Sequence, residues 1–321
     1  MSKSESQSRA SISFSHADHQ YPDMDTMVQL IQALQNSETR ERALLLLSKN
    51  RIIREELAPL LWHSFGTITT LLQEIILVYH SLSSAHLTER VSNRVCNALA
   101  LLQGVAAHPD TKMLFIKAKI PSYLLPFLNN TSKEKSHEYL RLASLGVIGA
   151  LVKVDDAEVV HYILNSELFP SFLCCMEVGA ELSKTVATFI VHRILVHEEG
   201  LKYCCILADR FFVIVNVLGT MIEKLAEDGR LVEDHSKRLL KHIIWCYKRL
   251  SEHPRACDAL RSCLPMKLKH PSFINILRDD ETAMQCIQKL LDNVAAGHWS
   301  RQIAGQPVAQ LLGRLIRGQI G

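Results

Sequence analysis

The chain has 321 residues, of which 48% are hydrophobic and 21% charged, so it can form a continuous core and is not a disordered polypeptide. Its formal net charge of +3 is too small to indicate a partner, and an electrostatic argument must therefore rest on local clusters of charge. With only 13 glycines and 6% aromatic residues, the composition favours packed helices over sheets.

Both the first residues and the cysteines favour an intracellular protein. Residues 1–22 contain seven serines without an apolar stretch, which predicts a disordered tail and excludes a secretory signal. The nine cysteines lie mostly in apolar stretches, which is typical of reduced thiols. No apolar run reaches the roughly 18 residues needed to cross a bilayer. We therefore expect a soluble protein without membrane contact.

From Asp25 onward, apolar residues recur at intervals of three and four, as on one face of a helix. The first such stripe runs from Met27 to Leu34. Ser37 is then placed to cap a second helix over 38–49, and a third helix is expected over 62–79. Later stripes begin at Val91 and Leu140, and no segment sustains the alternation of a strand.

A longer pattern also recurs: an apolar helix, a polar break, a short helix and a proline. Its clearest copies are 102–121 and 247–265, and a third copy covers 151–170, where Asp156 can cap the short helix. The spacing from Pro121 to Pro170 is near the about 40 to 47 residues of an armadillo or HEAT unit. The chain is therefore predicted to be all-α, an armadillo-like right-handed helical solenoid of about six three-helix repeats over 23–296. Residues 297–321 are predicted to be a C-terminal tail of uncertain structure.

No motif indicates catalysis or a cofactor. Gly146 and Gly149 lie within a helical stripe rather than between a strand and a helix, which excludes a nucleotide-binding turn. The sequence has no H-E-x-x-H motif and no cysteine pair at the spacing of a zinc knuckle. Cys96 and Cys246 lie in apolar helices, where burial makes a thiol a poor nucleophile. We predict that the chain is not an enzyme and has no metal and no cofactor.

The stretch from Lys237 to Arg249 is basic and contains no acidic residue. At helical spacing, Arg238, Lys241, Trp245 and Arg249 share one face, and the opposite face is apolar. Two interpretations stay open: this face binds a polyanion or acidic peptide, or it is a solvated face with Trp245 packed at its margin. Residues that would extend the same groove, if their helices line one concave side, are Arg94, Arg141 and Lys153.

Gly146 and Gly149 would lie on a concave helix in this scheme. Each glycine lowers helix propensity by roughly 1 kcal/mol relative to Ala, so its presence needs a reason. Close helix packing and access for a ligand are the two explanations.

Six longer blocks carry the most specific sequence signal: APLLWHSFGTITTLLQEI at 58–75, SNRVCNALALLQGVAAHPDTK at 92–112, EYLRLASLGVIGALVK at 138–153, ELSKTVATFI at 181–190, RLLKH at 238–242 and LSEHPRACDALRSCLP at 250–265. These blocks resemble the required-for-cell-differentiation family, the armadillo-repeat subunit of the Ccr-Not messenger-RNA deadenylase complex. The resemblance extends from about Asp25 to Asn293.

The resemblance implies a six-repeat crescent that docks on the large Not scaffold subunit and recruits regulatory proteins through tryptophan or short linear motifs. It also implies weak nucleic-acid binding in a basic groove that includes Arg94, Gly146, Gly149 and Arg238. A tryptophan-binding surface is implied near Arg210, His253 and Arg255. The loop over 226–237 is longer than in the family and Trp245 replaces a polar or basic residue, which puts the shape beside Arg238 in question. A homodimer stays open.

The predicted function is a non-catalytic scaffold or adaptor for mRNA deadenylation, mRNA decay and translational repression, in the cytoplasm and also in the nucleus. One alternative is an armadillo protein whose main ligand is nucleic acid. Another is a transport or signalling adaptor for peptides, but such receptors carry a ladder of Trp with Asn four residues later. Here the three tryptophans, Trp62, Trp245 and Trp299, are followed at that spacing by Gly66, Arg249 and Ile303.

Overall fold

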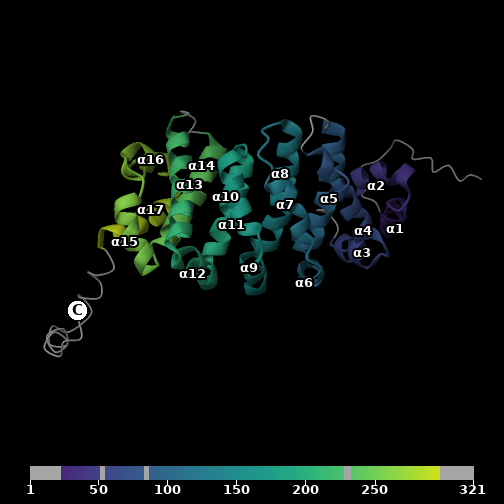
Figure 1. Ribbon diagram of the computed structural model, residues 1–321, viewed down its shortest axis with the longest axis horizontal. Helices are drawn as coiled ribbons and strands as arrows, with labels where there is room; N and C mark the ends of the chain where they lie inside the picture. Colours follow the sequence, from purple (N-terminus) through teal and green to yellow (C-terminus); the bar gives the residue numbers. More distant parts are fainter. Residues whose placement is uncertain (1–22, 51–54, 83–86, 228–232, 297–321) are drawn as a thin grey trace, which may run out of the picture.

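The computed structural model describes residues 23–50, 55–82, 87–227 and 233–296, so the predicted tails at 1–22 and 297–321 lie outside the described residues. Every regular element in the described part is a helix. The helices stack in one elongated row, with α1 near one end and α15 to α17 at the other (Figure 1). The predicted all-α solenoid is confirmed.

Six helical units follow one another in the described residues. The first contains α1 (Met24–Ala33) and α2 (Ser37–Asn50), and the second contains α3 (Leu57–His63), α4 (Thr67–Ile76), η1 (Tyr79–Ser81) and α5 (Glu89–Ala107). The third contains α6 (Pro109–Lys117), η2 (Ile120–Leu124), α7 (Leu125–Leu128) and α8 (Lys135–Lys153), and the fourth contains α9 (Ala157–Leu164), α10 (Leu168–Val178) and α11 (Glu181–Val196). The fifth contains α12 (Glu198–Ile206), α13 (Ala208–Glu227) and α14 (Asp234–Leu250), and the sixth contains α15 (Pro254–Cys263), η3 (Met266–Lys269), α16 (Pro271–Ile276) and α17 (Glu281–Ala296).

The last helix of each unit packs against the last helix of the next. The resulting series is α2, α5, α8, α11, α14 and α17, and we call its outer surface the ladder face. In the predicted repeat scheme, the third helix of each unit lines the concave side. Because each helix contacts the equivalent helix of its neighbours, the ladder face extends along the whole described solenoid.

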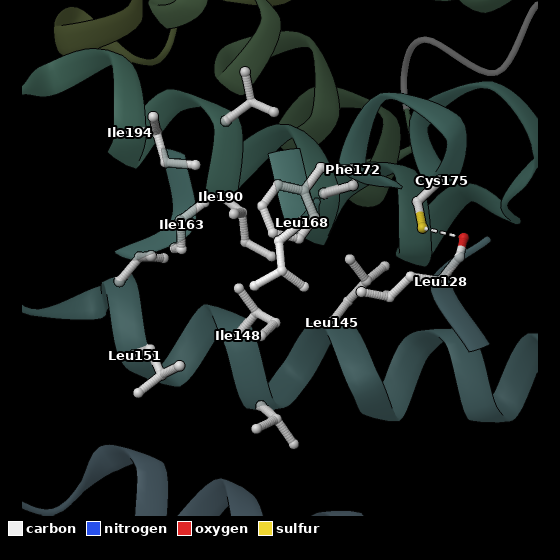
Figure 2. Close-up of a cluster of buried hydrophobic side chains, with 14 of the residues drawn as sticks. Leu128, Leu145, Ile148, Leu151, Ile163, Leu168, Phe172, Cys175, Ile190 and Ile194 are labelled. Carbon is white, nitrogen blue, oxygen red and sulfur yellow. Dashed lines mark hydrogen bonds between the residues drawn. The ribbon is translucent and has the colours of Figure 1, made fainter. Parts of the chain in front are cut away.

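Neighbouring units share one apolar core. Leu145, Ile148 and Leu151 project from α8 toward a cluster of buried side chains (Figure 2). That cluster comes from the next unit and contains Ile163 of α9, Leu168 and Phe172 of α10, and Ile190 and Ile194 of α11. Burying each such side chain contributes about 1.5–3 kcal/mol, which no unit could achieve alone.

The predicted helix starts are largely confirmed. α6 begins at Pro109 and α15 at Pro254, each directly after a histidine, as the recurring pattern indicates. The Asp156 carboxylate accepts from the backbone N–H of Glu158 at 3.0 Å and caps α9. Proline fits a first helical turn because the amide hydrogen that it lacks would have no helical partner there.

Two local predictions are wrong. The helix expected over 62–79 is broken, because α3 ends at His63 and Gly66 adopts a left-handed conformation with φ of 75° before α4 begins. The cap of α2 is Asn36 rather than Ser37, since the Asn36 side chain accepts from the Glu38 N–H at 3.0 Å. Both errors come from chain turns that apolar periodicity does not reveal.

No single helix in the described residues is long and apolar enough to cross a membrane. Two pairs of consecutive helices meet that test only when combined, α9 with α10 across an 81° bend and α12 with α13 across a 102° bend.

Candidate functional site on the ladder face

The two glycines of α8 lie on the ladder face with room around them. A Cβ atom at Gly146 would lie 3.5 Å from Gln103 Oε1, and one at Gly149 would lie 3.7 Å from Val186 Cγ1. Both are ordinary van der Waals distances, and both glycines are partly exposed. Close packing therefore does not require either glycine, and the geometry favours the explanation that they keep the surface open.

Arg141 does not line the groove, which corrects the prediction. Its side chain is fully buried and forms an ion pair with Glu138 on the same helix. It also donates to the carbonyl oxygens of Asn130 at 2.6 Å and Ser132 at 2.8 Å. These bonds hold the segment before α8 against the helix, so the cation is structural.

Arg94 is also held within the protein. Its guanidinium makes two bonds to the Glu74 carboxylate, Nη2 to Oε1 at 2.7 Å and Nε to Oε2 at 2.5 Å. Glu74 is itself buried and pairs with Arg40 at 3.2 Å. The hydrogen bond to Glu74 raises the pKa of Arg94, and the carboxylate offsets its charge. Lys153, by contrast, is exposed at the end of α8.

The apolar face predicted for α14 is confirmed, because Leu239, Ile243, Tyr247 and Leu250 are all buried. The opposite face is less basic than the absence of acidic residues in this stretch predicts. Acidic residues from other elements pair with three of its cations: Lys241 with Asp280, Lys248 with Glu252, and Arg249 with Glu198 and Glu252. The hydrogen bond from Lys241 lowers the pKa of Asp280.

Arg249 also links two neighbouring units. It donates from Nε to the Leu195 carbonyl at 2.9 Å and from Nη2 to the Val196 carbonyl at 3.1 Å. These carbonyls close α11 and have no partner within the helix. Arg193 makes the equivalent bond one unit earlier, to the Val152 carbonyl of α8 at 3.1 Å. An arginine of each of these ladder helices thus caps the ladder helix before it.

Arg238 is the predicted cation of α14 that remains available. Its side chain is exposed, and it makes no hydrogen bond or ion pair with other described residues. The positive charge on this part of the ladder face is therefore smaller than the sequence indicates.

Trp245 packs into a small aromatic cluster with one side open. Its ring centroid lies 5.3 Å from that of His192 on α11 and 5.1 Å from that of His242. Phe189 adds an edge contact to His242 at 5.6 Å. Burial lowers the pKa of His192 and of His242 to about 4, so both rings are neutral at physiological pH.

A hollow of about 530 Å³ adjoins this cluster, bounded by His192, Val196, Trp245 and Cys286 on the apolar side. Trp245 is half-buried, because it packs on the two histidines and also lines this hollow. The interpretation as a binding face and the interpretation as a packed residue therefore each describe one side of the ring. His192 and Cys286 were not predicted as part of this site because they belong to neighbouring units. Aligning α11, α14 and α17 as equivalent helices is the signal that could have found them.

The predicted tryptophan-binding residues lie near the starts of two helices, Arg210 on α13 and Arg255 on α15. The Arg210 guanidinium lies 3.5 Å from the centroid of the Tyr203 ring and donates to the Tyr203 carbonyl at 2.5 Å. Arg255 is exposed at the start of α15, next to the half-buried His253, whose pKa is lowered by burial and by Arg255. Among the described residues no hydrogen bond or ion pair joins Arg210 to either of them.

A larger hollow, of about 860 Å³, lies between α6 and α9 and was not predicted. Its floor is apolar, with Met113, Ile116 and Leu125. Its rim carries Tyr162, whose hydroxyl lies 3.2 Å from Ser122 Oγ, and His161, whose Nδ1 lies 2.9 Å from a carboxylate oxygen of Glu199.

Comparison with known proteins identifies relatives of this chain. Residues 30–294 match the model of the cell differentiation family, Rcd1-like. The chain is 50% identical over 262 residues to the cell differentiation protein rcd1 of Schizosaccharomyces pombe, an alignment that covers 82% of this chain and 90% of that protein. It is 49% identical over 252 residues to the protein CAF40 of Saccharomyces cerevisiae, covering 78% of this chain and 66% of that protein.

Solved structures show the same architecture. A designed armadillo repeat protein matches with a TM-score of 0.58 at 15% identity, covering 84% of this chain and 99% of the designed chain. A second designed armadillo repeat protein, solved with a (KR)4 peptide, matches with a TM-score of 0.56 at 14% identity. At these identities the likeness concerns the fold alone.

Proposed function

Because the chain belongs to the Rcd1-like cell differentiation family, we propose that it is a non-catalytic adaptor subunit of a Ccr-Not deadenylase complex. In this role it holds regulatory proteins near a deadenylase that other subunits supply. Its contribution to mRNA decay and translational repression is proximity, since a bound partner acts at a high effective concentration.

The observation that carries this proposal is the continuous ladder face. Its surface offers space at Gly146 and Gly149 and an open aromatic side at Trp245. Burial raises the pKa of Cys96 on α5 to about 11 and that of Cys205 on α12 to about 12, which makes both thiols poor nucleophiles. A long surface with few charges available suits short peptide segments.

The partners that we propose are the large Not scaffold subunit and regulatory proteins with tryptophan or short linear motifs. The stacked Tyr203 and Arg210 pair supports an aromatic ligand, since an indole can continue the stack on the guanidinium. We place this assembly in the cytoplasm and also in the nucleus.

The test is purification of the tagged full-length chain from its own cells, followed by identification of the proteins that co-purify. We expect deadenylase and Not subunits in stoichiometric amounts. Gly146→Trp should lose a subset of regulatory partners while retaining the Not scaffold. Gly146→Ala, which adds only a methyl group at the same position, is the matched control. Absence of every deadenylase subunit from the purified parent would overturn the proposal.

A nucleic-acid ligand is the second candidate, and exposed Arg238 beside Trp245 is the observation in its favour. Because Lys241 and Arg249 are paired, we expect weak binding of a single-stranded oligonucleotide, with a log-log salt slope near 0.7 for one phosphate contact. A slope several times steeper, abolished in Arg238→Glu, would favour nucleic acid as the main ligand. A flat slope with unchanged binding would remove it.

A further inference from the structure

Two neighbouring ladder helices bring three potential metal ligands together at their N-terminal ends. Glu181 is the first residue of α11, and Glu233 and His235 stand at the start of α14. His235 Nε2 lies 2.7 Å from Glu233 Oε2 and 3.3 Å from Glu181 Oε2. One ligand atom from each residue falls within 4.8 Å of the other two. Within the described residues this is the one triad of His, Cys, Asp or Glu with that property.

One of the carboxylates is already oriented toward the histidine. Ser236, which is buried, donates from Oγ to Glu181 Oε1 at 2.6 Å. Oε2 of the same carboxylate is left on the side of His235. An outer hydrogen bond of this kind fixes a ligand's geometry and is typical of metal sites. A hollow of about 230 Å³ beside Glu181 and Ser236 leaves room for water.

We propose that Glu181, Glu233 and His235 bind a divalent transition metal, with Zn²⁺ as the ion that they fit. Zinc is bound by imidazole nitrogen and carboxylate oxygen at roughly 2.0–2.2 Å, which places tetrahedral ligand atoms roughly 3.4 Å apart. The 3.3 Å separation of His235 and Glu181 already meets this value. Glu233 is exposed and needs only a small side-chain movement. Water would complete the coordination.

Other charges nearby set the expected affinity. The positive ends of α11 and α14 meet here, and Lys184 lines the adjoining hollow. These positive charges weaken the binding of a divalent cation. Two carboxylates and the absence of a thiolate also favour an exchangeable ion over a permanent structural zinc. We therefore expect micromolar binding that joins the fourth unit to the fifth beside Arg238. This site goes beyond the proposed function and is independent of it.

This inference revises the sequence-based prediction that the chain has no metal. That prediction rested on ligand spacing in the sequence, and Glu181 lies a whole repeat unit before His235. The competing explanation of the triad is a hydrogen bond from the His235 ring N–H to the two carboxylates, without any ion. A metal would need the same nitrogen without its proton, so direct binding of zinc separates the two explanations.

The test is isothermal titration of the metal-free full chain with ZnCl₂ at pH 7.5, with MgCl₂ as the comparison ion. We expect saturable zinc binding that weakens at least tenfold in His235→Ala and in Glu233→Gln. The matched control is His161→Ala, which removes an exposed histidine paired with the single carboxylate of Glu199. It should bind zinc like the parent.

Thermal unfolding shows whether a variant has lost the zinc site or has lost its fold. Zinc should raise the Tm of the parent and of His161→Ala, and it should leave the Tm of His235→Ala unchanged, while circular dichroism shows all three folded. Zinc binding of equal affinity in folded His235→Ala, or no saturable binding by the parent, would overturn the site.

Discussion

The ladder face is built differently on α8 and on α14. On α8 the predicted cation Arg141 is buried beneath the surface, and the exposed positions include two glycines. On α14 the cations stay near the surface but are paired with acidic residues of other elements. The difference teaches that a basic sequence does not by itself make a basic surface. What a partner meets is space at α8 and an aromatic side with Arg238 at α14.

Among the changes on α8, Arg141→Ala is expected to lower the free energy of unfolding the most. It leaves the Glu138 carboxylate without its cation and the carbonyls of Asn130 and Ser132 without their donor. Removing one partner of a buried pair costs about 3–5 kcal/mol of unfolding free energy. Urea denaturation followed by circular dichroism measures this loss.

The control for that experiment is Lys153→Ala, at the exposed end of the same helix. An exposed substitution of this kind should change the unfolding free energy by no more than about 0.5 kcal/mol. Equal stabilities for the two variants would mean that Arg141 is not the structural cation of α8.

Arg249→Ala is the corresponding test on α14. It removes the caps on the Leu195 and Val196 carbonyls together with the pairs to Glu198 and Glu252. We expect a loss of about 1.5–3 kcal/mol, the range for hydrogen bonds from a charged group, in the same denaturation assay. Arg238→Ala should stay within about 0.5 kcal/mol. A larger loss for Arg238→Ala than for Arg249→Ala would contradict the structural role of Arg249.

The aromatic cluster around Trp245 predicts that the free energy of unfolding depends on pH. His192 and His242 have folded-state pKa values of about 4, below the about 6.5 of an unfolded histidine, so the unfolded state binds more protons between these values. Their contribution is present above pH 6.5 and is lost as the pH falls toward 4. We expect a loss of about 2 kcal/mol for each histidine between pH 7 and pH 5.

Chemical denaturation across that pH range measures the effect. His242→Phe should flatten the pH dependence, because the titrating ring is removed while the aromatic contact to Trp245 remains. His161→Ala, which changes an exposed histidine of α9, should leave the dependence of the parent intact. An unchanged slope in His242→Phe would show that other groups carry the pH dependence.

The helical class and the repeat were predictable because each depends on residues close in sequence. Apolar spacing gave the stripes, and Asp156 and the histidine-proline pairs gave the helix starts. The site was less predictable. The partner of Lys241 comes from another unit, as do His192 for Trp245 and Glu181 for His235. Arg249 pairs with Glu198 of a different helix and caps carbonyls of the preceding unit. Which charges are paired depends on the register of one unit against the next, which a single sequence does not contain.

The smallest stability effect is expected at the glycines of α8. Gly146→Ala and Gly149→Ala place a methyl group at 3.5 Å from Gln103 and 3.7 Å from Val186, without a clash. Each change should be neutral or should raise the unfolding free energy by up to about 1 kcal/mol, through helix propensity. Gly200→Ala is the contrasting control, since its methyl would lie 2.0 Å from the Ile194 carbonyl oxygen, and it should destabilise the fold clearly.

Gly146→Trp then decides what the open space on α8 is for. An indole at this position points from a partly exposed site whose nearest neighbour is the flexible Gln103 side chain, so the fold can accommodate it. We expect its Tm to stay within a few degrees of the parent while a partner peptide that crosses α8 loses at least tenfold in affinity. A markedly lower Tm would mean that close packing is the reason for the glycine. A normal Tm with unchanged peptide binding would instead move the binding surface away from α8, to the aromatic cluster of α14.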